Sequence, residues 1–172
     1  MSRHGKLVKE KENAKVQRKR LKNAKKGLSV GEIQSYLTNS PSYMGAIEMS
    51  SFNQLVVKAN LYSFIVHCKH HFFVIYSSNN MFEIFDSLGF LTIKKCVSPQ
   101  FLQFLNNQLG LKTLKASQIL QPSSSYLCGI YCLFYIIMRD KGLSFEEILR
   151  LFSNNRKHND KFMTHFYNKL RK

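Results

Sequence analysis

The segment Cys128–Arg139 is the strongest constraint on how this chain folds. Its sequence, CGIYCLFYIIMR, is apolar at almost every position, and Gly142 follows shortly after it. A helix that is apolar around its whole circumference has to be covered by other elements rather than lie on a surface. We therefore expect a central buried helix over 128–139 that stops before Gly142. With 44% hydrophobic residues in a chain of 172, one domain can build a core around it.

Two aromatic segments upstream predict a β-hairpin. Residues 70–76 (HHFFVIY) and 81–85 (MFEIF) are rich in the aromatic and β-branched residues that strands favour. The turn cluster SSNN over 77–80 separates them. Further strands are expected over 61–67 and 113–120. Together these segments predict an α+β fold, with a small mixed β-sheet packed against the central helix that carries Cys128.

The remaining helices are predicted from their caps. Ser29 with Glu32, and Ser144 with Glu147, match the capping box in which two side chains satisfy each other's backbone N–H groups. Ser98-Pro99 has a cap residue followed by proline, which suits the first helical position. We expect helices over 29–37, from Ser98-Pro99 to Gly110, from Ser144 to about Phe152, and over 160–171 with Phe162, Met163, Phe166 and Leu170 facing inward.

Cys128 stands at the first position of the central helix, and Gln121 lies seven residues before it in the segment QPSSSYLCG. A helix N-terminus favours a thiolate over a thiol, because its unpaired N–H groups and its dipole stabilise negative charge. A side-chain amide held nearby can donate a hydrogen bond to an oxyanion. One short segment therefore offers a nucleophile, Cys128, and an oxyanion donor, Gln121.

The predicted hairpin offers a base and an acid for this thiol. His71 lies near the start of its first strand, and Asp86 directly follows its second. The open ends of a hairpin lie side by side, so these two side chains are expected to be neighbours. In a Cys/His/Asp triad the carboxylate fixes the imidazole and the imidazole activates the thiol. Along the chain the set reads His, Asp, Gln, Cys; papain-like enzymes place the cysteine first, which excludes that family.

These residues resemble the adenovirus maturation proteases (adenains) and the wider clan that includes the SUMO-specific proteases. The resemblance covers roughly residues 32–135. It implies Cys128 as nucleophile, His71 as base, Asp86 as the residue that orients the base, and Gln121 as oxyanion donor. The matching parts are His71-Phe72, Asp86 at the end of the next strand, and Gln121 separated by six residues from Cys128-Gly129.

The chain also departs from that family. Phe72 stands where the family usually has tryptophan, and the chain contains no Trp. The acid is Asp86, as in the SUMO-protease branch, whereas adenoviral enzymes use Glu. Adenoviral enzymes carry a cysteine upstream of the glutamine that captures a peptide cofactor by a disulfide, but the corresponding residues 110–113 (GLKT) include none. A disulfide-linked activator is therefore not expected. The resemblance also extends to the segment 41–45 (PSYMG), which it implies to be a loop on the substrate side.

Several residues have alternative interpretations. Cys128 could be an inert core cysteine, since buried cysteines are common, and Asp86 opens a segment, DSLG, with good turn chemistry of its own. Glu83 is a rival acid and His70 a rival base. We prefer His71 to His70 because the aromatic residue follows it directly. Cys132 is expected in the core, and His158 and His165 are expected in solvent. The cluster of His67, Cys68, His70 and His71 lacks the spacing of a zinc site.

Composition narrows the setting. No stretch approaches the ~18 uninterrupted apolar residues of a membrane span, and the basic N-terminus has no apolar stretch behind it, so no secretory signal is expected. The four cysteines do not suggest a secreted disulfide scaffold, because Cys128 and Cys132 are one turn apart on one helix. A reducing intracellular compartment is expected.

Positive charge is concentrated at the N-terminus. The formal net charge of the chain is +16, and residues 1–26 hold eleven Lys/Arg against Glu10 and Glu12. So basic and polar a segment is expected to be a disordered tail (1–27), with the peptidase domain over 28–172. Neutralising phosphates would make its binding to nucleic acid strongly salt-dependent. The expected nucleic-acid contacts, which also fit a nuclear-import signal, are Arg18, Lys19, Arg20, Lys22, Lys25 and Lys26; a solubilising tail is the alternative.

The resemblance implies a cysteine endopeptidase, a monomer that cleaves viral or capsid precursor proteins at glycine-containing sites during virion maturation. Its source would be a DNA virus or a virus-like mobile element, and its place the host nucleus and the virion. The chemistry requires no cofactor or metal, while DNA, a known cofactor of adenoviral proteases, or a peptide activator could stimulate it. Two alternatives remain: a peptidase specific for SUMO or ubiquitin-like proteins, and a catalytically silent basic module that binds DNA.

Overall fold

The computed structural model describes residues 27–54, 60–78, 81–89, 98–109 and 113–172. The predicted tail falls outside these ranges except for Gly27, so the six basic residues proposed to contact nucleic acid are not described. Gly110, the expected end of one helix, also falls outside them. In the described part no helix has the length and apolar character needed to cross a membrane.

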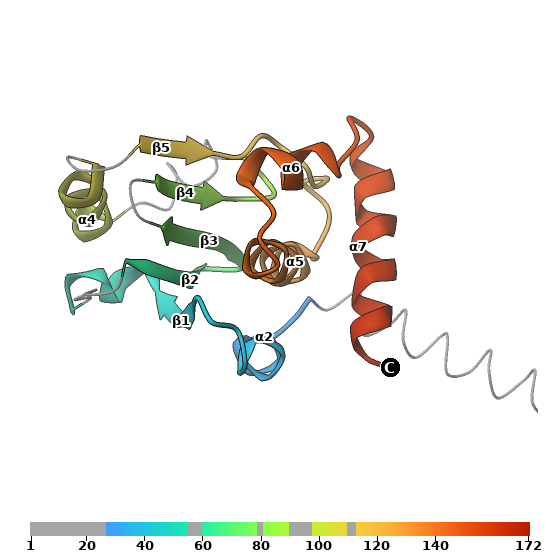
Figure 1. The fold of residues 1–172 in the computed structure, drawn as a ribbon, viewed down its shortest axis with the longest axis horizontal. Coiled ribbons are helices and arrows are strands. Elements are labelled where there is room, and N and C mark those ends of the chain that lie inside the picture. Colours follow the sequence, from blue (N-terminus) through green and yellow to red (C-terminus); the bar gives the residue numbers. More distant parts are fainter. Residues whose placement is uncertain (1–26, 55–59, 79–80, 90–97, 110–112) are drawn as a thin grey trace, which may run out of the picture.

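A five-stranded mixed sheet forms the middle of the domain (Figure 1). Its strands lie in chain order, with the outer pairs β1–β2 and β4–β5 parallel and the inner pairs antiparallel. The predicted α+β fold with a mixed sheet is confirmed. The strands are β1 (Tyr43–Glu48), β2 (Leu61–Cys68), β3 (His71–Ser78), β4 (Met81–Phe85) and β5 (Thr113–Ala116).

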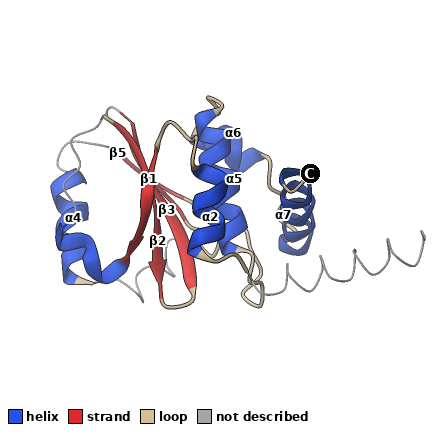
Figure 2. Cartoon of the chain, turned by 90° about the horizontal axis from the view of Figure 1, so that it is seen from below, coloured by secondary structure: helices blue, strands red, loops and turns tan. Residues whose placement is uncertain are grey.

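Helices cover both faces of the sheet (Figure 2). The 3-10 helix η1 (Met49–Gln54) packs with α4 (Pro99–Leu109), and α4 lies on one face of the sheet. On the other face, the central helix α5 (Cys128–Asp140) packs against β3 and against α2 (Val30–Leu37). The short helix α6 (Phe145–Arg150) lies on the same side as α5, and α7 (Arg156–Leu170) lies beyond α5.

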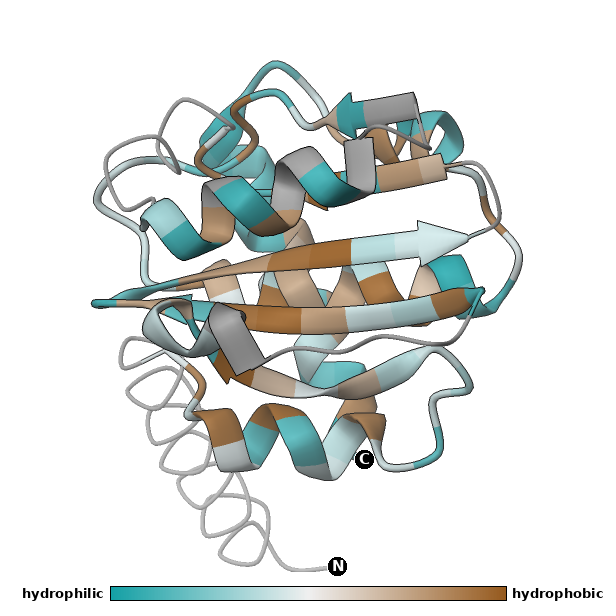
Figure 3. Cartoon of the chain, turned by 90° about the vertical axis from the view of Figure 1, so that its left-hand side faces the viewer, coloured by the Kyte–Doolittle hydropathy of each residue, from teal (hydrophilic) through white to brown (hydrophobic). Residues whose placement is uncertain are grey.

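Each face of the sheet has its own apolar core. Along β3, Phe72, Val74 and Tyr76 belong to the core on the α5 side, while Phe73 and Ile75 belong to the core on the α4 side. Because both faces are covered, the middle parts of the central strands carry consecutive apolar residues, which are brown in Figure 3, while the strand ends are pale or teal. Helix α5 is buried continuously from Cys128 to Ile136, which confirms the predicted buried central helix.

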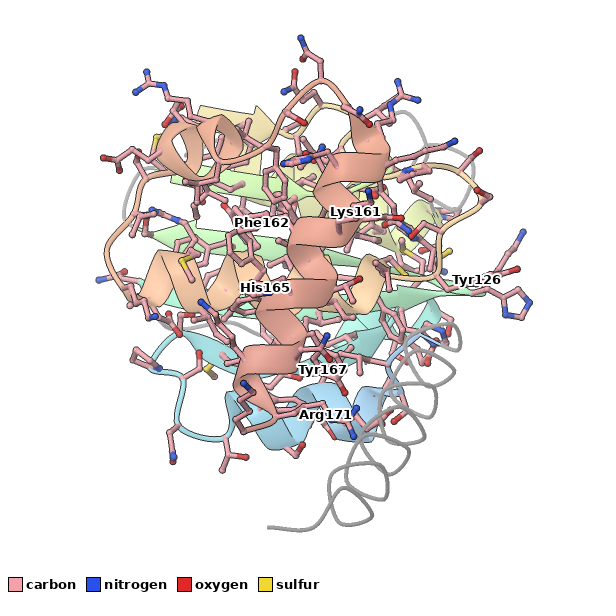
Figure 4. The ribbon with its side chains drawn as sticks, turned by 90° about the vertical axis from the view of Figure 1, so that its right-hand side faces the viewer. Tyr126, Lys161, Phe162, His165, Tyr167 and Arg171 are labelled. Atoms are coloured by element: carbon pink, nitrogen blue, oxygen red, sulfur yellow. The ribbon has the colours of Figure 1, made fainter. Side chains whose placement is uncertain are left out.

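Helix α7 packs against this core from outside (Figure 4). Met163 is fully buried, and the rings of Phe162 and Phe166 lie edge-to-face on Phe134 at centroid distances of 5.4 and 5.0 Å. The predicted inward face is thus confirmed. The helix begins at Arg156 rather than at residue 160, because the Asn155 side chain accepts a hydrogen bond from the His158 N–H and caps it there.

Both capping boxes, at Ser29 and at Ser144, are present as predicted. Three other segment boundaries differ from the prediction. Strand β3, however, starts at His71, because His70 belongs to the turn that follows β2. The segment expected as a substrate-side loop contributes Tyr43–Gly45 to strand β1 instead. Strand β5 ends at Ala116 rather than at residue 120, since beyond it the N–H groups of Leu120 and Gln121 both bond to the Ser87 carbonyl.

Candidate active site

Cys128 is the first residue of α5 and is 7% exposed. The residue before it, Leu127, supplies no side-chain cap, so the N–H groups of the first turn are not taken up by a capping side chain. Gly129 lets α5 approach its neighbours closely, because a Cβ at that position would lie 3.1 Å from Ile33 Cδ1 and 3.3 Å from Leu28 Cβ. The thiol therefore lies at a helix N-terminus in tightly packed surroundings.

The His71 ring bridges this thiol and a buried carboxylate. Its Nε2 lies 2.7 Å from Asp86 Oδ1, and the ring also hydrogen-bonds the Cys128 side chain. Because the carboxylate can only accept, Nε2 is the donor, which leaves Nδ1 for the thiol. Burial acts to lower the pKa of His71, but the hydrogen bonds and charges of Asp86 and Cys128 outweigh it and raise this pKa to about 10. The expected proximity of His71 and Asp86 is confirmed.

Asp86 is held rigidly where β4 ends. Its side chain is fully buried, and Oδ1 also accepts a hydrogen bond of 2.8 Å from the Leu88 N–H. Ser117 fixes its backbone on both sides, accepting from the Asp86 N–H at 2.7 Å and donating to the Asp86 carbonyl at 2.6 Å. The DSLG segment thus makes a turn and also orients the Asp86 carboxylate, so the structural and the functional interpretations of Asp86 are compatible.

Gln121 is 1% exposed, and its amide is fixed at both ends. Its Oε1 accepts a hydrogen bond of 2.6 Å from Ser87 Oγ, and its Nε2 donates one of 2.8 Å to the Ser125 carbonyl. An amide nitrogen carries two hydrogens, so one N–H of Gln121 is not used by these bonds, although Gln121 is not among the residues that line the cleft described below. Sequence reasoning missed Ser87 and Ser125, because a serine in a turn carries no signal of the partner that it binds across the fold.

An open cleft of about 690 Å³ leads to Cys128 and His71. One wall comes from the end of β2, the turn after it and the start of β3, and the facing lining comes from residues 27–30 and from the loop before α5. Tyr126 is 67% exposed in that loop and lies at the edge of the molecule, to one side of α7 (Figure 4). The lining residues are Gly27, Leu28, Ser29, Val30, His67, Cys68, Lys69, His70, His71, Phe72, Leu88, Ser123, Ser125, Tyr126 and Cys128.

The rival residues have other places. Glu83 is 2% exposed and pairs with Arg139 (2.9 Å) and with the Tyr135 hydroxyl, so it is occupied in the core. His70 is exposed in the turn beside His71. Burial raises the pKa of the Cys132 thiol well above its usual value, which is how a core cysteine behaves and fits the prediction for it.

The remaining histidines do not form a metal site in the described part of the chain. His158 and His165 are exposed on α7, as predicted. Within the ranges that the structure describes, no group of three or more His, Cys, Asp or Glu side chains is arranged to hold a metal ion. His67 instead pairs with Glu48 through Nδ1 at 2.7 Å and stacks on Phe72 at a centroid distance of 4.6 Å.

Comparison with known proteins finds a similar fold but no related sequence. No protein-family model matches the chain, and no curated protein matches it in sequence. Among solved structures, the central domain of an uncharacterized protein of Legionella pneumophila is similar, with a TM-score of 0.51 and 15% sequence identity. The match covers 84% of this chain and 97% of that one. At this identity the likeness concerns the fold alone.

Proposed function

We propose that this chain is a cysteine endopeptidase with Cys128 as nucleophile. The observation that carries the proposal is the chain of hydrogen bonds from Asp86 through His71 to Cys128 at the N-terminus of α5. A thiol, an imidazole and a buried carboxylate in this order provide nucleophile, proton carrier and orienting group. An open cleft gives a peptide access to the sulfur.

The chemistry follows from these positions. The Cys128 sulfur attacks the scissile carbonyl carbon, and the resulting oxyanion is stabilised by the remaining Gln121 N–H and the backbone N–H of Cys128. Breaking the C–N bond releases the amine, which takes its proton from His71, and leaves a thioester on Cys128. Water, giving its proton to His71, then attacks the thioester carbonyl to release the acid and restore the thiol. Asp86 keeps Nδ1 of His71 directed at the sulfur throughout.

The test is cleavage of glycine-containing peptides and of a ubiquitin-like protein that ends in diglycine. Wild type is compared with Cys128→Ala and His71→Ala, and Cys132→Ala is the matched control because it removes a thiol one helical turn away in the core. We expect the first two substitutions to abolish cleavage and the control to retain it. If wild type cleaves nothing and Cys128 alkylates no faster than Cys132, the proposal is wrong and the silent DNA-binding module becomes the better description.

Which substrate is cleaved faster distinguishes the two peptidase alternatives, a viral processing protease and a SUMO-type peptidase. The family resemblance supports viral or capsid precursors, cleaved in the host nucleus and the virion, and this part of the proposal rests on sequence alone. Efficient cleavage of the short peptides would favour a processing protease, whereas a strong preference for the folded ubiquitin-like substrate would favour the SUMO-type alternative.

We also propose that DNA binds the basic segment 1–26 and raises the cleavage rate. The support is its charge, since neutralising several phosphates releases counterions and gives binding a steep dependence on salt. A variant with Arg18, Lys19 and Arg20 all changed to Ala should bind duplex DNA more weakly, with a shallower salt dependence, and should be stimulated less. Equal binding by this variant and wild type would contradict the assignment.

A further inference from the structure

Part of the cleft lining is basic and is not used by the proposed chemistry. Among its lining residues are Lys69 and three histidines, but no aspartate or glutamate. Lys and Arg outnumber Asp and Glu by 11 to 8 among the described residues, but this excess comes from residues 156–172, none of which lines the cleft. Three carboxylates that contact lining residues are engaged: Glu48 with His67, Asp86 with His71 and Glu32 with Ser29.

Two of these basic residues, Lys69 and His70, form the whole turn between β2 and β3. Cys68 pairs with His71 across the hairpin, so the turn directly precedes the candidate base. Both side chains are exposed, and neither has an ion pair with another residue in the part of the chain that the structure describes. The positive charge of Lys69 and the ring N–H of His70 are therefore open to a ligand in the cleft.

The backbone conformation of Lys69 is one that a lysine rarely adopts. Its φ is 58°, and elsewhere among the described residues positive φ values occur only at glycines. Two-residue hairpin turns usually place Gly, Asn or Asp in this left-handed region, because a longer side chain is unfavourable there. A lysine that a glycine would replace without strain suggests that the side chain, rather than the turn, has a use.

We propose that Lys69 and His70 select substrates that carry a carboxylate side chain close to the scissile bond; this inference rests on the proposed peptidase function. Ser123, an exposed residue that also lines the cleft, adds a hydroxyl able to donate to the same carboxylate. The hydroxyls of Ser29 and Ser125 are already bonded to Glu32 and Asp160. One ammonium group, one imidazole and one hydroxyl suit a single carboxylate rather than the long row of phosphates on a nucleic acid. The pairing is partly exposed to solvent, so its effect is moderate and sensitive to salt.

The experiment compares glycine-containing peptides that differ only in one residue beside the scissile bond, which is Asp, Asn or Lys. Asp and Asn have nearly the same shape, so their ratio of kcat/KM isolates the charge. For wild type we expect the Asp peptide to be favoured over the Asn peptide about fivefold at low salt, with the ratio falling toward one in 0.5 M NaCl (about the size of an exposed ion pair). The Lys peptide should be the poorest substrate.

The decisive variant is Lys69→Gly, since glycine accepts the backbone conformation of this turn. It should lose the Asp preference, so that the kcat/KM values of the Asp and Asn peptides become nearly equal, while the urea midpoint stays at the wild-type value. Lys69→Arg should retain the preference. Lys141→Ala is the matched control, because Lys141 is an exposed lysine at the far end of α5 from Cys128, about 20 Å away at the helical rise.

The two proposals fail in different ways. If the Asn peptide is cleaved but Lys69→Gly keeps the full Asp preference, or Lys141→Ala loses it equally, the inference is overturned and the peptidase stands. If no peptide is cleaved by wild type and Cys128 alkylates no faster than Cys132, the peptidase is overturned, and the inference falls with it.

Discussion

Ser87→Ala is the most informative single substitution, because the Ser87 hydroxyl contacts Gln121, the proposed oxyanion donor, and not the proposed triad. Its hydroxyl donates to Gln121 Oε1 at 2.6 Å, and both residues are 1% exposed. Removing the donor leaves a buried acceptor unpaired, which costs about 1–3 kcal/mol of folding free energy. The amide also loses one of its two anchors while keeping the bond from Nε2 to the Ser125 carbonyl.

The catalytic effect should be intermediate. Complete loss of an oxyanion donor, as in Gln121→Ala, is expected to lower kcat by about 10²–10³. Ser87→Ala keeps the donor but loosens it, so we expect kcat to fall about tenfold, which corresponds to about 1.4 kcal/mol in the transition state, while KM stays nearly constant. Steady-state cleavage of one peptide gives kcat and KM, and urea unfolding gives the free energy of unfolding.

Ser124→Ala is the matched control. Ser124 is exposed in the loop before α5, and its substitution should change neither kcat nor stability. The reasoning is refuted if Ser87→Ala lowers the free energy of unfolding as expected but leaves kcat unchanged, because the serine would then serve the fold alone. A Gln121→Ala variant within threefold of the wild-type kcat would remove Gln121 from the oxyanion site altogether.

Three further predictions concern stability. The pKa of His71 is raised from 6.5 to about 10, so protonation of His71 stabilises the fold fully below about pH 6.5, and this stabilisation is lost as the pH rises through about 10. Urea unfolding should therefore show a free energy of unfolding that declines from pH 6 to 10 in wild type and not in His71→Gln. Arg139→Met leaves Glu83 without its cation at 2% exposure and should cost about 3 kcal/mol at pH 8. Because burial already raises the pKa of Glu83, protonation should make this deficit smaller near pH 5, and an equal deficit at both values would contradict the buried pairing. Gly129→Ala puts a Cβ 3.1 Å from Ile33 Cδ1 and should lower the thermal midpoint through a loss of about 1–2 kcal/mol; an unchanged midpoint would mean that α2 moves away at little cost.

Much of the candidate site could be predicted because its signals are local. The position of Cys128 at a helix start follows from where the apolar run begins, and the contact of His71 with Asp86 follows from hairpin geometry. His70, predicted as part of the strand, lies in the turn before it. What distinguished His71 from His70 was the aromatic residue that follows His71, and Phe72 indeed joins the core beside α5.

The missed residues are those whose role depends on contacts between distant segments. Ser87 meets Gln121 across 34 positions, and Ser117 meets Asp86 across 31. No local pattern marks such serines, since the same residue type suits any turn. The early end of β5 has the same origin, because the N–H groups of Leu120 and Gln121 bond to the Ser87 carbonyl in the turn after β4.

The sequence by itself determined the elements whose signals are periodic or capped: the buried central helix, the aromatic hairpin and the two capping boxes. It also placed a thiol, an imidazole, a carboxylate and an amide at the ends of those elements. Only the tertiary structure decided how these groups are held and which charges surround them, including the two anchors of Gln121 and the exposed Lys69 at the cleft. Hydrophobic periodicity specifies which face is buried, whereas hydrogen-bond partners and charge surroundings depend on which segments the packed core brings together.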